Sequence, residues 1–205
     1  MTEQYPTPTD PDVFEIDDDT LVRYRGKSPD VVIPDGVRCI GDRAFWLSRT
    51  LRSVVIPDSV TDIGENTFFG CTALVRVSLP RALISIGHRA FYGCGRLTDV
   101  VFPDTVVRIA SSAFGGCTSL TEAIFPASLK LIGQGAYDGC TGLLRIEIPA
   151  TISNIGPQAF SGCTALEHVT IPKKYKLTLD RFFTDANFNL FGKASIGKAK
   201  ITFLE

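Results

Sequence analysis

The sequence contains little of what most catalytic and metal-binding sites need. Only two histidines, His88 and His168, occur among 205 residues. Neither lies in a recognisable metal, triad or nucleophile motif, and the glycines form no phosphate-binding loop. We therefore expect a protein without enzyme activity, and without a cofactor or a bound metal ion.

The chain also lacks an excess of charge and long apolar runs. Its formal net charge is −1, whereas a protein that binds nucleic acid by neutralising phosphates needs a dominant basic surface. No run approaches the roughly 18 apolar residues of a membrane span. The first residues lack the basic start and the apolar stretch of a signal peptide. These absences predict no nucleic-acid partner, no membrane span and a cytoplasmic location.

What the sequence does contain is a repeat of 23 residues, with six full copies in residues 34–171. The proline series is Pro34, Pro57, Pro80, Pro103, Pro126, Pro149 and Pro172. The aromatic series is Phe45, Phe68, Phe91, Phe114, Tyr137 and Phe160. A constant period of this length indicates a solenoid, in which each coil buries its apolar face only by stacking on its neighbours.

Each repeat begins with the alternation of a half-buried strand. In LRSVVIP, we expect Val54 and Ile56 to point inward and Ser53 and Val55 to point outward. The proline ends the strand because it has no N–H to donate. A shorter alternation in SVTDIG and a compact turn in NTFFGC follow, which leaves no room for a long helix. The prediction is a mainly β repeat solenoid.

The unit LRSVVIPDSVTDIGENTFFGCTAL and its copies resemble the BspA-like leucine-rich repeats, also called the Treponema pallidum type or type 5. The resemblance covers about two-thirds of the chain. It implies a right-handed, curved leucine-rich-repeat solenoid with a parallel sheet on one face. It also implies a protein-binding or adhesive role rather than catalysis. Many relatives are cell-surface proteins, a location that the missing export signal does not support here.

Both ends of the chain depart from the repeat. We expect a disordered tail over residues 1–12 and an N-terminal cap with an irregular first coil over residues 13–33. Residues 172–205 are expected to form a degenerate half repeat and a C-terminal cap, closing with a strand near Lys200–Leu204. Solenoids need such caps because their end coils would otherwise expose apolar faces and strand edges.

The two ends also differ in charge. The first 20 residues contain seven acidic and no basic side chains, whereas residues 173–205 contain seven basic and three acidic ones. A monomer is the expected state, with both ends acting as solvated termini. Attraction between the opposite charges makes head-to-tail self-association a second hypothesis.

A cysteine recurs at the same point of five repeats, as Cys71, Cys94, Cys117, Cys140 and Cys163. Stacked coils place neighbouring Cα atoms about 4.8 Å apart, which permits disulfides, but five thiols in one column cannot all pair. A straight column also lacks the tetrahedral enclosure that zinc prefers. The favoured interpretation is a small buried filler that faces the backbone of the coil. Cys39, at a variable outward position, is a candidate reactive thiol.

Two outward rows are candidate protein-binding surfaces. On the strand face, Val55, Val101 and Ile124 are apolar where water is expected, and a neighbouring row includes Arg76 and Arg145. The alternative interpretation is that valine and isoleucine are present for their strand propensity.

The second outward row follows the aromatic series by one residue and begins with Trp46, Phe69 and Tyr92. If the aromatic series points inward, these three side chains point outward and form an apolar patch of the kind that marks contacts. Alternatively, the N-terminal segment with Tyr5 and Phe14 covers them. We expect a non-enzymatic protein-interaction scaffold, with a structural or cell-surface adhesive element as the alternative. The sequence does not identify the protein partner.

Overall fold

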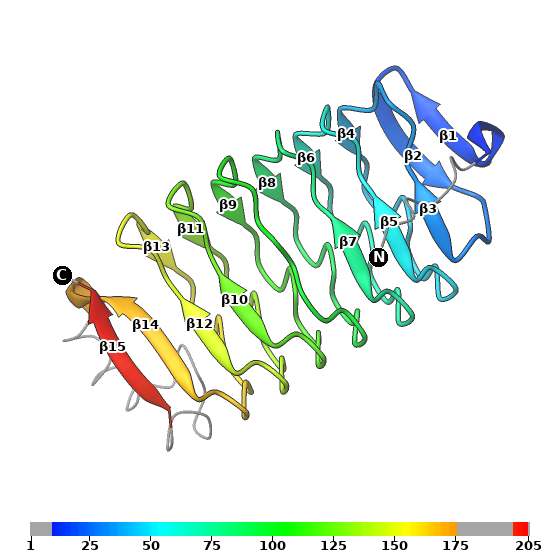
Figure 1. Cartoon of the computed structure of the whole chain (residues 1–205). Coiled ribbons are helices and arrows are strands. Elements are labelled where there is room, and N and C mark those ends of the chain that lie inside the picture. Colours follow the sequence, from blue (N-terminus) through cyan, green and yellow to red (C-terminus); the bar gives the residue numbers. More distant parts are fainter. Residues whose placement is uncertain (1–9, 176–198, 205) are drawn as a thin grey trace, which may run out of the picture.

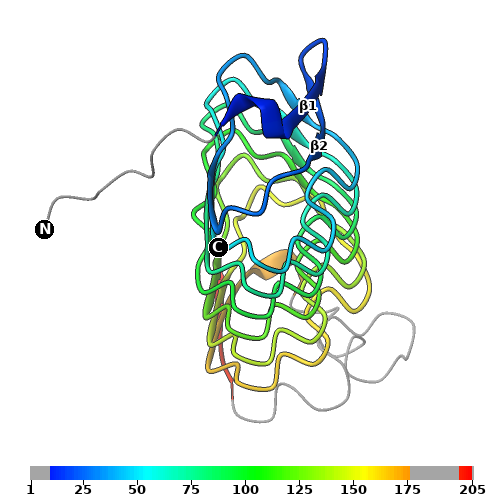
Figure 2. The ribbon, with the colours of Figure 1, turned by 90° about the vertical axis from the view of Figure 1, so that its right-hand side faces the viewer.

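The computed structural model of the protein describes residues 10–175 and 199–204. Within these residues the chain winds into stacked coils, and the regular elements are short strands and two 3-10 helices (Figure 1). Viewed along the stack, successive coils follow nearly the same path (Figure 2). The predicted mainly β solenoid is confirmed, and no α-helix occurs in the part of the chain described.

One side of the solenoid carries an eight-stranded sheet in the order β1-β2-β4-β6-β8-β9-β11-β13. Its first two strands, β1 (Phe14–Asp17) and β2 (Thr20–Tyr24), form an antiparallel hairpin, and all later pairs are parallel. The later strands contain two residues each: β4 (Cys39–Ile40), β6 (Asp62–Ile63), β8 (Ser85–Ile86), β9 (Arg108–Ile109), β11 (Leu131–Ile132) and β13 (Asn154–Ile155). The short SVTDIG alternation thus builds a sheet of its own.

The longer strands lie along a second side of the solenoid, in two parallel sheets. The first consists of β3 (Asp30–Val32), β5 (Ser53–Val55) and β7 (Arg76–Ser78). The second consists of β10 (Glu122–Ile124), β12 (Arg145–Glu147), β14 (His168–Pro172) and β15 (Lys200–Leu204). The structure therefore has parallel ladders on two sides, where the resemblance implied a sheet on one face.

The row of longer strands is interrupted at residues 99–101, which form no strand. The hydrogen bonds that join successive coils at the start of this segment are long. The Thr98 and Thr121 N–H groups donate over 3.4 and 3.3 Å, compared with 2.9 Å for Val75 and 2.8 Å for Leu144. The segment around residues 99–101 is therefore held less tightly than the equivalent segments of neighbouring coils, and strand geometry is lost there.

The core is built from columns of equivalent side chains. The aromatic series is buried throughout, and its rings stack coil upon coil with centroids 4.9–5.4 Å apart and interplanar angles of 4–19°. Tyr24 extends the column by one ring from the irregular first coil, 5.0 Å from Phe45. The predicted inward orientation of this series is confirmed.

The N-terminal end is closed by the β1–β2 hairpin. Phe14 is buried there against Tyr24, with ring centroids 5.3 Å apart, so it packs within the cap. A 3-10 helix, η1 (Pro11–Val13), precedes it, and the Asp12 N–H donates to the Asp10 side chain. Part of the expected disordered tail is therefore ordered, while Tyr5 lies outside the described residues.

At the other end, β15 pairs in parallel with β14, over the residues where the sequence analysis expects a closing strand. A second 3-10 helix, η2 (Lys173–Tyr175), follows β14 directly. The remainder of the expected half repeat, residues 176–198, lies outside the described residues. At the N-terminal end, by contrast, the eight-stranded sheet begins with the antiparallel strand β1, which does not offer the parallel edge on which further coils are added.

Tyr137 is the one polar member of the aromatic series, and its hydroxyl is buried without a hydrogen-bond partner. We expect Tyr137→Phe to raise the free energy of unfolding by about 1–2 kcal/mol, because it removes an unsatisfied polar group and keeps the ring. Urea denaturation followed by circular dichroism measures the change. Tyr24→Phe is the matched control: it removes a bond from the Ser28 N–H to the Tyr24 hydroxyl and is expected to destabilise. A loss of stability in Tyr137→Phe would contradict the prediction.

Candidate protein-interaction surfaces

The five column cysteines are free and buried, and each has a hydrogen-bond partner at the equivalent position of the repeat. The thiol donates to the backbone carbonyl of the aromatic residue that lies 26 positions earlier, over 3.1–3.3 Å. Burial raises the pKa of Cys71 and Cys140 to about 12, so both remain protonated donors well above neutral pH. The interpretation as a buried filler that faces the backbone is confirmed, and the column belongs to the scaffold rather than to a reactive surface.

Cys39 stands apart from this column, half-buried at the start of β4. Burial raises the pKa of its thiol, and the carboxylates of Asp62, Asp19 and Asp42 raise it further. The thiolate is the reactive form of cysteine, and this environment disfavours it. The structure therefore argues against Cys39 as a reactive thiol.

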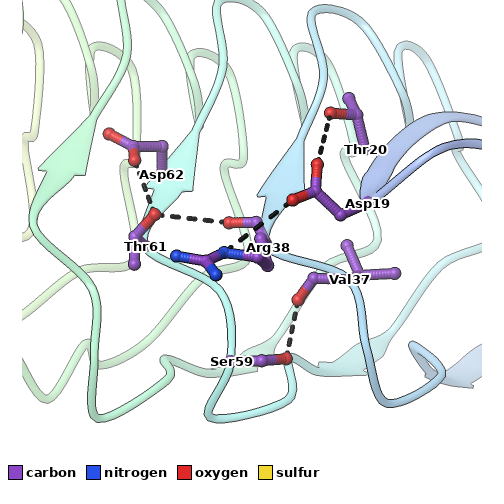
Figure 3. A network of polar contacts seen from close by, with 7 residues as sticks. All are labelled: Asp19, Thr20, Val37, Arg38, Ser59, Thr61 and Asp62. Carbon is purple, nitrogen blue, oxygen red and sulfur yellow. Dashed lines mark hydrogen bonds and ion pairs between the residues drawn. The ribbon is translucent and has the colours of Figure 1, made fainter.

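Two of these carboxylates, those of Asp19 and Asp62, belong to a polar network at the starts of β2, β4 and β6 (Figure 3). Asp19 lies 3.8 Å from the Arg38 guanidinium, and Asp62 accepts a hydrogen bond of 2.7 Å from Thr61. Asp62 also accepts a hydrogen bond from Ser85 in the next coil. Through these contacts the carboxylates of Asp19 and Asp62 both have polar partners, and the network links neighbouring coils.

On the strand face, the candidate residues differ in how far they are exposed and in their partners. Val101 is 82% exposed and Ile124 is 42% exposed, whereas Val55 is half-buried. Arg76 is exposed at the start of β7, and Arg145 forms an ion pair with Glu147 within β12. The strand interruption thus coincides with Val101, the most exposed large apolar side chain among the described residues.

Trp46, Phe69 and Tyr92 form what we call the aromatic ridge. Trp46 is 52% exposed and Tyr92 37% exposed, while Phe69 lies half-buried between their coils. The rings of Phe69 and Tyr92 stack, with centroids 5.4 Å apart and an interplanar angle of 7°. The ridge is thus partly exposed to solvent, and its role in binding stays a prediction.

The exposure of Trp46, the single tryptophan, can be measured directly. We expect acrylamide to quench its fluorescence nearly as efficiently as that of a free indole, because half of the side chain faces solvent. The protein in denaturant provides the fully exposed reference. Weak quenching in the native protein would mean that another segment covers the indole, which was the alternative considered from the sequence.

Sequence reasoning missed the residues that lie three positions before the ridge. Arg43, Asn66 and Arg89 have positive φ angles of 59°, 54° and 51°. The Arg89 guanidinium carbon lies 5.7 Å from the centroid of the Tyr92 ring, within the range of a cation–π contact. The sequence does contain an arginine at this repeat position in two coils, and that recurrence is the signal that could have revealed the charge beside the ridge.

Two further tests concern metals and membranes. Among the residues that the structure describes, no group of three or more His, Cys, Asp or Glu side chains is arranged to hold a metal ion. Over the same residues, no helix has the length and apolar character needed to cross a membrane.

Comparison with protein families gives one match that spans most of the chain. The family model described as the BspA type leucine rich repeat region matches residues 23–143 and 84–196, with six copies. A search of curated proteins gives no significant match.

Several solved structures are similar to this chain. The leucine-rich repeat protein of T. pallidum has 29% sequence identity and a TM-score of 0.78, covering 94% of this chain and 100% of its own. A leucine-rich cell surface protein of Faecalibacterium prausnitzii A2-165 has 30% identity and a TM-score of 0.67, covering 82% of this chain and 55% of its own. A leucine-rich repeat protein of Bacteroides ovatus has 28% identity and a TM-score of 0.72, covering 88% of this chain and 43% of its own.

Proposed function

Because this chain belongs to the BspA-type leucine-rich-repeat family, we propose that it is a non-enzymatic scaffold that binds another protein through the outer side chains of its coils. The observation that carries the proposal is the exposure of large apolar residues at positions that the repeat leaves free. Val101 is 82% exposed and Trp46 52% exposed. Exposed apolar groups of this size, repeated along a rigid surface, are typical of interaction sites.

The different roles of the inner and outer positions of the repeat support this proposal. The inner columns stack in every coil and determine the scaffold, so they carry no information about a partner. The thiols with strongly raised pKa values donate to backbone carbonyls inside the coils. These titratable groups therefore serve packing rather than acid–base chemistry at a surface.

Affinity capture from a lysate of the native cell tests the proposal with three proteins. The wild type is compared with Val101→Glu/Ile124→Glu on the strand face and with Trp46→Ser/Tyr92→Ser on the aromatic ridge. We expect the wild type to retain a specific partner and one folded variant to lose it. Circular dichroism and the melting temperature verify that both variants fold. If no sample retains a partner, the binding function is not supported.

A second candidate function is a structural or adhesive role at the cell surface. It is favoured by the F. prausnitzii relative, which is described as a cell surface protein and shares 30% identity over 82% of this chain. The expected cytoplasmic location stays a prediction, because a relative's location does not determine that of this chain. Protease treatment of intact native cells separates the two: a surface protein is degraded, whereas a cytoplasmic protein survives until the cells are lysed.

A further inference from the structure

The aromatic ridge is fixed in place by the backbone beneath it. The Leu47 N–H donates to the Phe69 carbonyl over 2.8 Å, and the Gly70 N–H donates to the Tyr92 carbonyl over the same distance. These bonds join three successive coils at the ridge itself. A Cβ atom on Gly115 would lie 2.7 Å from the Tyr92 ring, so this ring packs directly over the next coil. The ridge is therefore ordered before any partner binds, which lowers the entropic penalty of binding.

The arginines beside the ridge occupy a backbone conformation that does not suit them. Arg43 and Arg89 have positive φ angles, a region that glycine enters without strain and that asparagine tolerates. The equivalent positions of the other coils contain Asn66, Ser112, Gly135 and Gln158, and all of them share the positive φ angle. The conformation therefore belongs to the repeat and does not select one residue type. The two arginines stand in the coils that expose Trp46 and Tyr92, where they place positive charge beside the ridge.

These arginines also lack carboxylate partners. The described residues contain five ion pairs, and none involves Arg43, Arg89, Arg49 or Arg96, of which the last two follow the ridge by three and four residues. The carboxylates on the same turns belong to Asp42 and Glu65, and Asp42 already accepts a hydrogen bond of 2.7 Å from the Glu65 N–H. The ridge is thus flanked by an excess of positive charge within a chain whose net charge is −1.

The stacking of the rings limits how a partner can bind them. Because Phe69 and Tyr92 stack face to face, each covers one face of the other, and Gly115 lies against the Tyr92 ring. Nucleic-acid bases stack on free ring faces, and these two rings offer them little. Trp46, which is 52% exposed, presents a larger apolar surface to a partner.

From these observations we propose that the aromatic ridge and its arginines bind an acidic segment of a partner protein that also carries apolar side chains. Apolar residues of the segment pack on Trp46 and against the neighbouring rings of Phe69 and Tyr92. Its carboxylates pair with the guanidinium groups of Arg43 and Arg89, which are the charged donors best suited to bidentate contacts with carboxylates. This inference rests on the proposed protein-binding function and specifies the chemistry of the partner.

The test selects short random peptides displayed on phage against the full-length protein, and then measures synthetic versions of the enriched peptides. We expect enriched peptides to be acidic with apolar residues, to shift the fluorescence of Trp46 on binding and to bind more weakly at high salt. Trp46→Ala and the Arg43→Asn/Arg89→Asn double variant should each weaken binding by about tenfold or more. Arg108→Asn removes the same charge from an exposed position of β9, outside the ridge, and should leave binding unchanged.

The double variant also separates binding from folding. Each asparagine suits a positive φ angle better than arginine does, so the melting temperature should stay the same or rise by about 2–4 °C per substitution. A folded or stabilised protein that no longer binds supports the proposal. A merely structural role for these arginines predicts instead a lower melting temperature and unchanged peptide binding by the folded protein.

Other outcomes overturn the inference, and they do so in distinguishable ways. Neutral or basic peptides at the ridge, binding of a single-stranded oligonucleotide there, or a concentration-dependent shift of Trp46 fluorescence without peptide would each identify a different occupant. Peptides lost in Val101→Glu/Ile124→Glu but retained by the ridge variants would overturn the ridge and keep the protein-binding function. If no peptide is enriched, both proposals lose their support.

Discussion

Raising the pH from about 9 to about 11 is expected to unfold this protein, although it carries no unusual charge. The cause is the cysteine column. Burial raises the pKa of Cys71 and Cys140 to about 12 and raises the pKa of Cys94 and Cys117 well above the ordinary range. A cysteine in the unfolded chain titrates near pH 8.5.

The direction of the effect follows from proton binding. Below about pH 8 the thiols are protonated in the folded and in the unfolded chain, and their titration does not affect stability. At higher pH the unfolded chain releases protons that the folded chain retains, so the free energy of unfolding falls until the pH passes the folded pKa. Each fully titrating thiol lowers it by about 1.4 kcal/mol per pH unit. Two thiols alone therefore remove about 4–6 kcal/mol between pH 9 and 11, comparable to the total stability of many domains.

Urea denaturation at a series of pH values under reducing conditions measures this slope. The double variant Cys94→Ala/Cys117→Ala has fewer titrating thiols and is expected to lose stability less steeply with pH, even though it is less stable at pH 7. Cys39→Ala is the control outside the column. A slope that does not change in the double variant would mean that the tyrosines or other groups govern the alkaline transition.

The inner columns of this fold could be predicted from the sequence because the same physical requirement recurs in every coil. A side chain that packs on its own equivalent, such as Phe68 on Phe91, leaves a constant interval in the sequence. The outward orientation of Val101 and Trp46 followed from the same periodicity. Neither inference required knowledge of contacts between coils.

The features that escaped prediction depend on backbone geometry that a periodic pattern does not encode. The sequence could place the cysteines in a column but did not reveal that each thiol donates to a carbonyl of the preceding coil. The segment of residues 99–101 has the same alternation as its neighbours, yet it forms no strand. The positive φ angles of Arg43 and Arg89 were equally hidden, because arginine is not a residue that indicates this conformation. The ridge could therefore be predicted as aromatic, but its flanking charge could not be placed beside it.

The second large effect is expected at the centre of the aromatic column. Phe91 is fully buried and stacks between Phe68 and Phe114, with centroids 5.0 and 5.2 Å away. We expect Phe91→Ala to lower the free energy of unfolding by about 3–5 kcal/mol, because it removes the buried ring, interrupts the stack on both sides and leaves a cavity. The neighbouring coils cannot collapse into this cavity freely, because their spacing is set by hydrogen bonds such as that from the Phe91 N–H to the Ala113 carbonyl.

Phe69→Ala provides the matched comparison, since it removes the same side chain from the ridge of a neighbouring coil. Phe69 is half-buried and has one stacking partner, so we expect a loss of about 1–2 kcal/mol. Guanidinium denaturation of the two variants gives both values under the same conditions. Equal losses would mean that the column is not the main source of cohesion between coils. A larger loss for Phe91→Ala would show that stability resides in the inner column, so that the ridge could change in sequence without loss of the fold.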